Sequence, residues 1–271
     1  MTPVRLIATD IDGTLLDGSG VIPPENIDAI RAAQAKGITV AIASGRFAEN
    51  VYLLLRDYGL SCFIIGGNGA DITDEGLKPV RFQTMKQASA LAVKRVLDDH
   101  GADYFFYGEH WLCTSADSFL HHTELSHPGQ AQQLGFSYYH GQRDAGERVL
   151  HPVYKFYICA NVPLPPIRQD LAGIPDIDIT RSGPGNIEVM PQGVNKAQGV
   201  RDLAAHLGIP LSQVMTLGDE ENDIPMLKIA GYGVAMGNGS AAARAAARIV
   251  TDSNCRGGFA KAIRQYALQE G

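Results

Sequence analysis

Two aspartates spaced two residues apart, Asp10 and Asp12, follow a short apolar segment, Val4–Ala8, near the start of the chain. The segment predicts a buried β-strand. Residues i and i+2 of an extended chain project to the same side, so both carboxylates are expected to face one pocket beyond the end of the strand. Two like charges this close repel each other unless a cation, a shared proton or ample water compensates. A divalent cation is the simplest answer. The alternative is a solvated turn, because Asp, Gly and Thr are common turn residues.

The next two residues, Gly13 and Thr14, suit an anion. Glycine relaxes the backbone of the turn, and threonine offers a hydroxyl and an amide to a phosphate oxygen. Mg²⁺ prefers oxygen ligands at roughly 2.0–2.1 Å and keeps several waters, so carboxylates, a backbone carbonyl and a substrate oxygen would complete its coordination. A carboxylate can also act as a nucleophile and form an aspartyl-phosphate that water later hydrolyses.

Three further polar residues stand where predicted elements begin or end. Ser44 follows the apolar strand Thr39–Ala43, Lys196 opens a predicted helix, and Asp219 follows the strand Val214–Leu217. Strand ends that are distant in sequence converge on one rim of a doubly wound sheet, where ligands bind. These residues are therefore expected to share a pocket with Asp10 and Asp12, and the set suits phosphoryl transfer.

The elements that must position these residues alternate between strand and helix. This rhythm predicts the α/β class, with a doubly wound parallel sheet joined by right-handed crossovers. Besides the strands already named, it predicts helices at Pro24–Lys36, Phe47–Tyr58, Lys196–His206, Ile224–Ile229 and from Phe259, strands at Cys62–Ile65 and Tyr232–Ala235, and a hairpin through Ala70–Thr73.

The middle of the chain has a different texture, with aromatic strands and frequent Pro and Gly. We expect residues 84–190 to form an inserted α+β domain and residues 1–83 and 191–271 to form the α/β core. Three histidines of the insertion invite a zinc hypothesis, but no acid or thiol stands at ligand spacing, which favours a polar surface. They are His121, His122 and His127.

Composition narrows the function classes. The 271 residues carry a formal net charge of −6 without a Lys/Arg run, so nucleic acid is not an expected partner. The longest apolar runs are of strand length, and no signal-peptide pattern opens the chain, which favours a cytoplasmic protein without membrane contact. The four cysteines lack Cys-x-x-Cys spacing and fit reduced thiols.

Four motifs in order resemble the haloacid dehalogenase superfamily, specifically the Cof-type phosphatases of subclass IIB, which have a large α/β cap. They are DIDGT at Asp10–Thr14, Ser44 in IASGR, Lys196 in GVNK, and GDEEND at Gly218–Asp223. The resemblance covers nearly the whole chain. It implies a Rossmann-like core, a cap that sets substrate specificity, Mg²⁺ as cofactor and a small phosphate ester as substrate. A monomer or weak homodimer is expected.

The resemblance also implies a role for each motif residue. Asp10 would be the nucleophile and a metal ligand, and Ile11 would offer its backbone amide to the phosphate. Asp12 would give its backbone carbonyl to the metal, and its side chain would protonate the leaving alkoxide and then deprotonate the attacking water. Ser44 and Gly45 would bind phosphate at a helix N-terminus.

The remaining implied roles fall in the third and fourth motifs. Lys196 would neutralise the charge gathering between nucleophile and phosphoryl oxygens. Asp219 would be the second metal carboxylate, Asn222 would contact phosphate, and Asp223 would orient the metal shell. Glu220 and Glu221 fit a helix N-terminus instead, although Glu220 replaces a small polar residue common in the family.

Some of these residues also have purely structural interpretations. Ser44 could be a helix N-cap, and Lys196 could be a solvated lysine at the start of a helix. Arg46 and Asn68 are left open between contacting substrate and stabilising their loops.

Three functions therefore remain open. The first is an Mg²⁺-dependent phosphatase of small phosphorylated metabolites, with sugar phosphates favoured. The second is a phosphomutase or phosphotransferase that uses the same core. The third is a silent binder of phosphorylated ligands, which the filled catalytic positions disfavour. The substrate is not readable from the sequence, because fold does not determine it.

Overall fold

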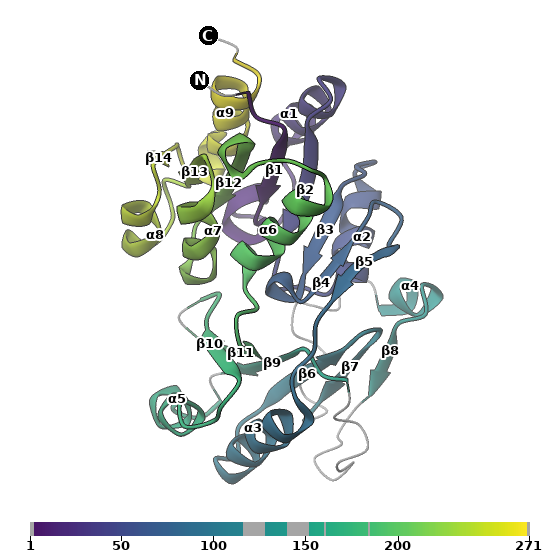
Figure 1. The fold of residues 1–271 in the computed structure, drawn as a ribbon, viewed down its shortest axis with the longest axis vertical. Coiled ribbons are helices and arrows are strands. Elements are labelled where there is room, and N and C mark those ends of the chain that lie inside the picture. Colours follow the sequence, from purple (N-terminus) through teal and green to yellow (C-terminus); the bar gives the residue numbers. More distant parts are fainter. Residues whose placement is uncertain (1–2, 116–127, 140–151, 160, 184, 270–271) are drawn as a thin grey trace. The chain divides into compact units, whose positions relative to one another are not determined.

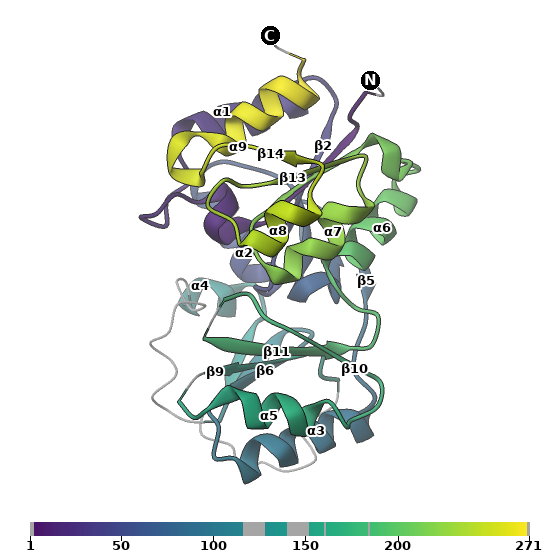
Figure 2. The ribbon, with the colours of Figure 1, turned by 90° about the vertical axis from the view of Figure 1, so that its left-hand side faces the viewer.

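The structure is a computed structural model that describes residues 3–115, 128–139, 152–159, 161–183 and 185–269 (Figures 1 and 2). The chain divides into two compact units: a core unit, Met1–Val80 with Asn195–Gly271, and an inserted unit, Arg81–Val194. The three histidines of the zinc hypothesis, residues 121, 122 and 127, lie outside the described residues.

An eight-stranded sheet organises the core unit, in the order β14-β13-β12-β1-β2-β3-β4-β5. The pairs from β14 to β3 are parallel, and β4 returns antiparallel to β3. The predicted α/β fold with a parallel-dominated sheet is confirmed. The strands are β1 (Leu6–Thr9), β2 (Thr39–Ala43), β3 (Phe63–Gly66), β4 (Asp71–Thr73), β5 (Pro79–Phe82), β12 (Val214–Gly218), β13 (Tyr232–Ala235) and β14 (Ile249–Val250).

Helices cover both faces of this sheet because its central strands are apolar on both sides. Ile7 of β1 packs into a cluster with helices α1, α2 and α9, whereas its neighbours Leu6 and Ala8 pack into a second cluster with α6 and α7. Helices α1 and α9 also contact each other (Figure 2). The helices are α1 (Pro24–Ala35), α2 (Ala48–Asp57), α6 (Lys196–His206), α7 (Ile224–Ile229), α8 (Ala241–Ala246) and α9 (Gly258–Ala262).

The inserted unit is built on its own six-stranded sheet, in the order β10-β11-β9-β6-β7-β8. Its pairs are antiparallel except β7 with β8. Helices α3 and α5 pack on one face, over a core that includes Phe106, Phe156 and Val189. The elements are α3 (Gln87–Asp99), β6 (Tyr104–Gly108), β7 (Trp111–Thr114), α4 (Pro128–Gln133), β8 (Ser137–Tyr139), β9 (Lys155–Cys159), α5 (Leu164–Leu171), β10 (Ile177–Thr180) and β11 (Asn186–Pro191).

Candidate active site

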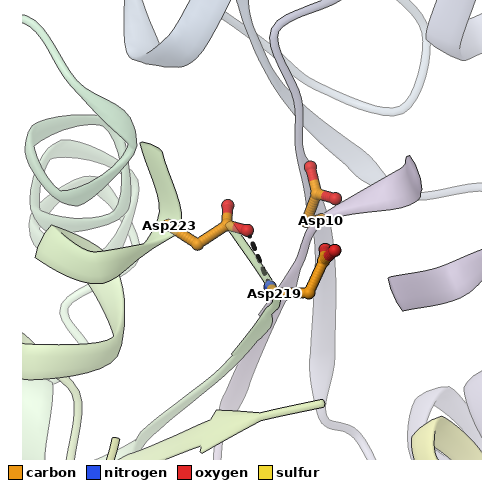
Figure 3. A group of neighbouring side chains, drawn as sticks. All are labelled: Asp10, Asp219 and Asp223. Carbon is orange, nitrogen blue, oxygen red and sulfur yellow. Dashed lines mark hydrogen bonds between the residues drawn. The ribbon is translucent and has the colours of Figure 1, made fainter. Parts of the chain in front are cut away.

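The acidic residues of the first and fourth motifs meet because their strands are neighbours. Strand β1 pairs in parallel with β12, with Thr9 beside Leu217, and the backbone N–H of Asp10 donates to the carbonyl of Leu217 at 3.0 Å. Asp10 and Asp219 therefore leave the same edge of the sheet side by side. Carboxylate oxygens of Asp10, Asp219 and Asp223 lie within 4.8 Å of one another (Figure 3).

Lys196, the first residue of α6, is buried against this acidic cluster. Its Nζ donates to Oδ1 of Asp10 at 2.5 Å and to Oδ1 of Asp223 at 2.6 Å. Only 1% of the Lys196 side chain is exposed. The Asn195 side chain caps α6 by accepting from the backbone N–H of Gln198, so the lysine projects from the fixed start of a helix. The solvated-lysine alternative is wrong.

Charges in the cluster do not balance among these four side chains. Burial raises the pKa of Asp10 well above its ordinary value, opposed by Lys196 and reinforced by Asp223. Burial and the charge of Asp223 raise the pKa of Asp219 to about 7. Burial alone would lower the pKa of Lys196, but Asp10 and Asp223 raise it, so the lysine stays a cation. Three buried carboxylates face one ammonium, an arrangement that a further cation would stabilise.

A divalent metal fits this cluster. The candidate ligands are carboxylate oxygens, which suit a hard cation such as Mg²⁺. Asp10 and Asp219 are the predicted carboxylate ligands. Oδ2 of Asp223 accepts from the backbone N–H groups of Asp219 and Glu220, at 2.8 and 3.0 Å, so Asp223 holds the loop that carries Asp219 (Figure 3). That arrangement agrees with its predicted supporting role.

The segment after Asp10 does not continue in extended form, and the Asp12 carboxylate is not one of the three that cluster around Asp10. The chain coils from Ile11 to Leu15, with Gly13 at a φ of 81°. The charge of Asp12 still contributes to the raised pKa of Asp10. The Asp12 side chain is 62% exposed and pairs with Arg46 at 2.7 Å.

Gly13 and Thr14 both help to place the Asp219 carboxylate. A Cβ on Gly13 would come within 2.3 Å of the Asp219 carboxylate, so only glycine permits the close approach of the two loops. The Thr14 hydroxyl donates to Oδ1 of Asp219 at 2.9 Å and is fully buried. The hydroxyl predicted for a phosphate oxygen thus orients a carboxylate.

Ser44 lies on the same rim, since β2 pairs with β1 in parallel. Its hydroxyl accepts from the backbone N–H of Arg46 at 3.2 Å, within the turn that precedes α2. The N-cap of α2 is Phe47, so Ser44 is not the helix cap that the sequence allowed. Gly45 is half-buried in this turn, whereas Ile11, the residue after Asp10, is fully buried.

Asn68 links Ser44 to the fourth motif. Its backbone N–H donates to the carbonyl of Ser44 at 2.8 Å, and its side-chain oxygen accepts from Nδ2 of Asn222 at 3.3 Å. Asn68 is buried in a left-handed conformation with a φ of 54°. Glu220 accepts from the backbone N–H of Glu221, in agreement with the helix-terminus interpretation of these acids.

Three asparagines that the sequence analysis did not single out hold the coil that follows Asp10. Their Nδ2 groups donate to backbone carbonyls of that coil at 2.8–2.9 Å: Asn238 to Gly13, Asn26 to Leu15 and Asn254 to Leu16. They satisfy carbonyls that the short coil leaves without helical partners. Asparagines in loops are common, so only the tertiary structure could identify them.

Comparison with known proteins identifies the family. The model of the haloacid dehalogenase-like hydrolase family matches residues 7–263. The chain belongs to the haloacid dehalogenase-like hydrolases. The predicted family, its Cof-type subclass and the enzyme class are thereby confirmed.

Relatives of this hydrolase have named activities. This chain is 31% identical over 267 residues to 5-amino-6-(5-phospho-D-ribitylamino)uracil phosphatase YcsE of Bacillus subtilis. The match covers 98% of this chain and 96% of the relative. Phosphatase YbjI of Escherichia coli, named for the same substrate, is 28% identical, with 98% and 97% covered.

Solved structures resemble the whole hydrolase. A haloacid dehalogenase-like hydrolase from B. subtilis is 26% identical with a TM-score of 0.83, covering 96% of this chain and 99% of that one. A sugar phosphatase of haloacid dehalogenase subclass IIB is 27% identical with a TM-score of 0.81, covering 98% and 100%. Among the described residues, no helix of this hydrolase is long and apolar enough to cross a membrane.

Proposed function

We propose that this protein is an Mg²⁺-dependent phosphatase that hydrolyses small phosphorylated metabolites through an aspartyl-phosphate on Asp10. The observation that carries the proposal is the buried cluster of Asp10, Asp219 and Asp223 with Lys196 bound to two of the three carboxylates. A nucleophilic carboxylate, a fixed cation and a candidate metal site are the parts that phosphoryl transfer needs.

Asp10 attacks phosphorus, the bond from phosphorus to the leaving oxygen breaks, and the alkoxide takes a proton from the carboxyl group of Asp12. Water then gives a proton back to Asp12 and attacks the phosphorus, which releases phosphate and restores Asp10. Lys196 stabilises the negative charge that gathers between Asp10 and the phosphoryl oxygens. Mg²⁺ held by Asp10, Asp219 and the Asp12 carbonyl would supply further charge neutralisation.

Phosphate recognition is proposed for the second motif and Asn222. Ser44, Gly45 and the Ile11 amide are the candidate donors, and Asn222 is held toward Asn68 by the bond at 3.3 Å. The exposed Asp12 carboxylate agrees with a role on the solvent side of the phosphoryl group, where a leaving group departs.

Sugar or sugar-alcohol phosphates are the proposed substrate class. Two observations support it: two relatives are named for 5-amino-6-(5-phospho-D-ribitylamino)uracil, a compound that contains a ribityl phosphate, and a similar solved structure is named a sugar phosphatase. We also propose that residues 84–190 act as a cap that sets selectivity among these esters. Substitutions there are expected to redistribute kcat/KM between esters.

The test is a phosphate-release assay over hexose phosphates, pentose phosphates and the ribityl phosphate named above, with Mg²⁺ and after exhaustive chelation. We expect release from at least one ester and its loss without metal. Release that survives chelation would contradict the metal requirement. An isomerised product that depends on a bisphosphate, without net phosphate release, would show a phosphomutase instead.

A further inference from the structure

Arg46 makes the contact that fixes the Asp12 carboxylate. Its Nε donates to Oδ2 of Asp12 at 3.1 Å and its Nη2 donates to Oδ1 at 2.7 Å. This two-point pairing matches the planar guanidinium to the planar carboxylate, which sets the orientation of the carboxylate as well as its position.

The arginine itself is held at both ends. Its backbone N–H donates to the Ser44 hydroxyl, and its backbone carbonyl accepts from Gly67 at 2.9 Å. Its Nη1 donates to Oδ1 of Asn50 at 3.3 Å. The Arg46 side chain is 18% exposed, against 62% for the Asp12 side chain, so the less exposed partner anchors the more exposed one.

An exposed aspartate without such an anchor would sample several rotamers, and only some would direct its carboxyl group to a leaving oxygen. We infer that Arg46 is a positioning residue that holds the Asp12 carboxylate at the leaving group, and that one of the two bonds opens when Asp12 carries the proton that it gives to the leaving alkoxide. The inference rests on the proposed phosphatase function and adds a residue that acts through Asp12 without touching the phosphoryl group.

Two substrates with different leaving groups, an alkoxide and a phenolate, distinguish positioning of the general acid from phosphate binding. An alkoxide must be protonated as its bond to phosphorus breaks, whereas the p-nitrophenolate ion leaves without a proton. The ratio kcat/KM reports the steps up to leaving-group departure. Loss of a positioned general acid therefore lowers kcat/KM for a sugar phosphate and spares p-nitrophenyl phosphate.

The experiment measures kcat/KM of the Mg²⁺-loaded full chain on both esters for wild type, R46A and R46K. We expect R46A to lose about 10–100-fold on the sugar phosphate, at nearly unchanged KM, and less than about threefold on p-nitrophenyl phosphate. R46K keeps the charge but cannot pair at two points, so it should fall between. R31A is the matched control and should equal wild type, because Arg31 bonds the Tyr58 carbonyl at the end of α2.

A double-mutant cycle with D12N decides whether Arg46 acts through Asp12. In the D12N background, R46A should cause no further loss on the sugar phosphate. Equal losses on both esters, additive losses in the cycle, or no loss from R46A with either ester would overturn the inference. If wild type releases phosphate from no ester, the proposed function itself fails, which is a different result from an unselective R46A. Matching thermal unfolding of wild type, R46A and R46K excludes a folding defect, and if R46A alone is destabilised the comparison of the two esters is made with R46K.

Discussion

Lys196 of the core unit and Lys155 of the inserted unit are both almost completely buried, but their electrostatic surroundings differ. Lys196 of the core unit touches two carboxylates of a three-acid cluster. Lys155 of the inserted unit pairs with Glu188 at 3.0 Å, and both side chains are essentially unexposed. Its Nζ also lies 5.2 and 5.4 Å from the ring centroids of Tyr107 and Tyr157.

We propose that this difference separates a lysine that takes part in catalysis from one that stabilises the fold. Around Lys155 the ammonium meets a carboxylate and two aromatic faces, which are all favourable partners for a buried cation. Around Lys196 the acids outnumber the lysine, and burial raises the pKa of Asp10 and Asp219. Such strain persists at sites that bind a ligand of opposite charge.

Of the changes considered for the acidic cluster, neutralising Asp10 is expected to cause the largest loss of activity. D10N should abolish turnover, a loss of more than about 10⁴-fold, because an amide is a poor nucleophile and a poor metal ligand. The fold should survive, since the side chains are nearly isosteric. Phosphate release and a thermal unfolding curve check both statements. Near-normal activity in a preparation free of contaminating phosphatase would rule out Asp10 as the nucleophile.

Removing either lysine should then show that the two differ. K196A is expected to lower kcat/KM by about 10²–10³-fold for every ester, because the charge it stabilises is common to all of them. Its thermal stability should also recover when Mg²⁺ is added, since the metal replaces a missing cation among three acids. A loss confined to some esters would instead place Lys196 in substrate selection.

Lys155 is expected to affect stability. K155A should destabilise the inserted unit by about 3–5 kcal/mol, because it leaves Glu188 buried without this partner. The double variant K155M/E188L should recover most of that loss, since an apolar pair of similar volume suits a buried site.

Trp111 makes this measurement specific to the inserted unit. It is the single tryptophan of the chain, and it packs edge-on against Phe106 with ring centroids 5.7 Å apart. Denaturant unfolding followed by tryptophan fluorescence therefore reports the inserted unit. A K155A midpoint equal to that of wild type would show that the ion pair adds nothing to stability.

The pH dependence of metal binding should be the smallest of these effects. It tests whether Asp219 of the acidic cluster changes its charge near neutral pH. The pKa of Asp219 is raised to about 7, so in the metal-free protein its proton stabilises the fold at low pH, and this contribution is lost as pH rises through about 7. Mg²⁺ binds the ionised carboxylate, so the rise in Tm that it causes should be larger near pH 8 than near pH 6. An equal rise in Tm at the two pH values would mean that Asp219 is ionised throughout this range.

Much of this architecture was predictable from local sequence signals. The bounds expected for β2, α6, α7 and β13 coincide with those observed, because Gly and Pro residues mark the ends of apolar runs. The parallel order of the strands also placed Asp10, Ser44, Lys196 and Asp219 on one rim. Where a strand ends, a residue's place on the sheet follows from the topology.

Side-chain partners were less predictable, because they depend on tertiary contacts between loops. Alternation along an extended chain put Asp12 beside Asp10, but the Asp12 carboxylate pairs with Arg46, 34 residues away in sequence. In the same way, Thr14 finds Asp219 across 205 residues. No spacing rule reaches that far.

The asparagine contacts to the coil after Asp10 have a consequence for the order in which the protein matures. Asp10, the proposed nucleophile, stands just before this coil, yet Leu16 receives its bond from Asn254, which is synthesised 238 residues later. Asn238 bonds Gly13 from a loop that emerges only slightly earlier. The coil after the proposed nucleophile thus lacks these bonds until Asn254 has been synthesised, so chains that stop before Asn254 should neither capture nor hydrolyse phosphate esters.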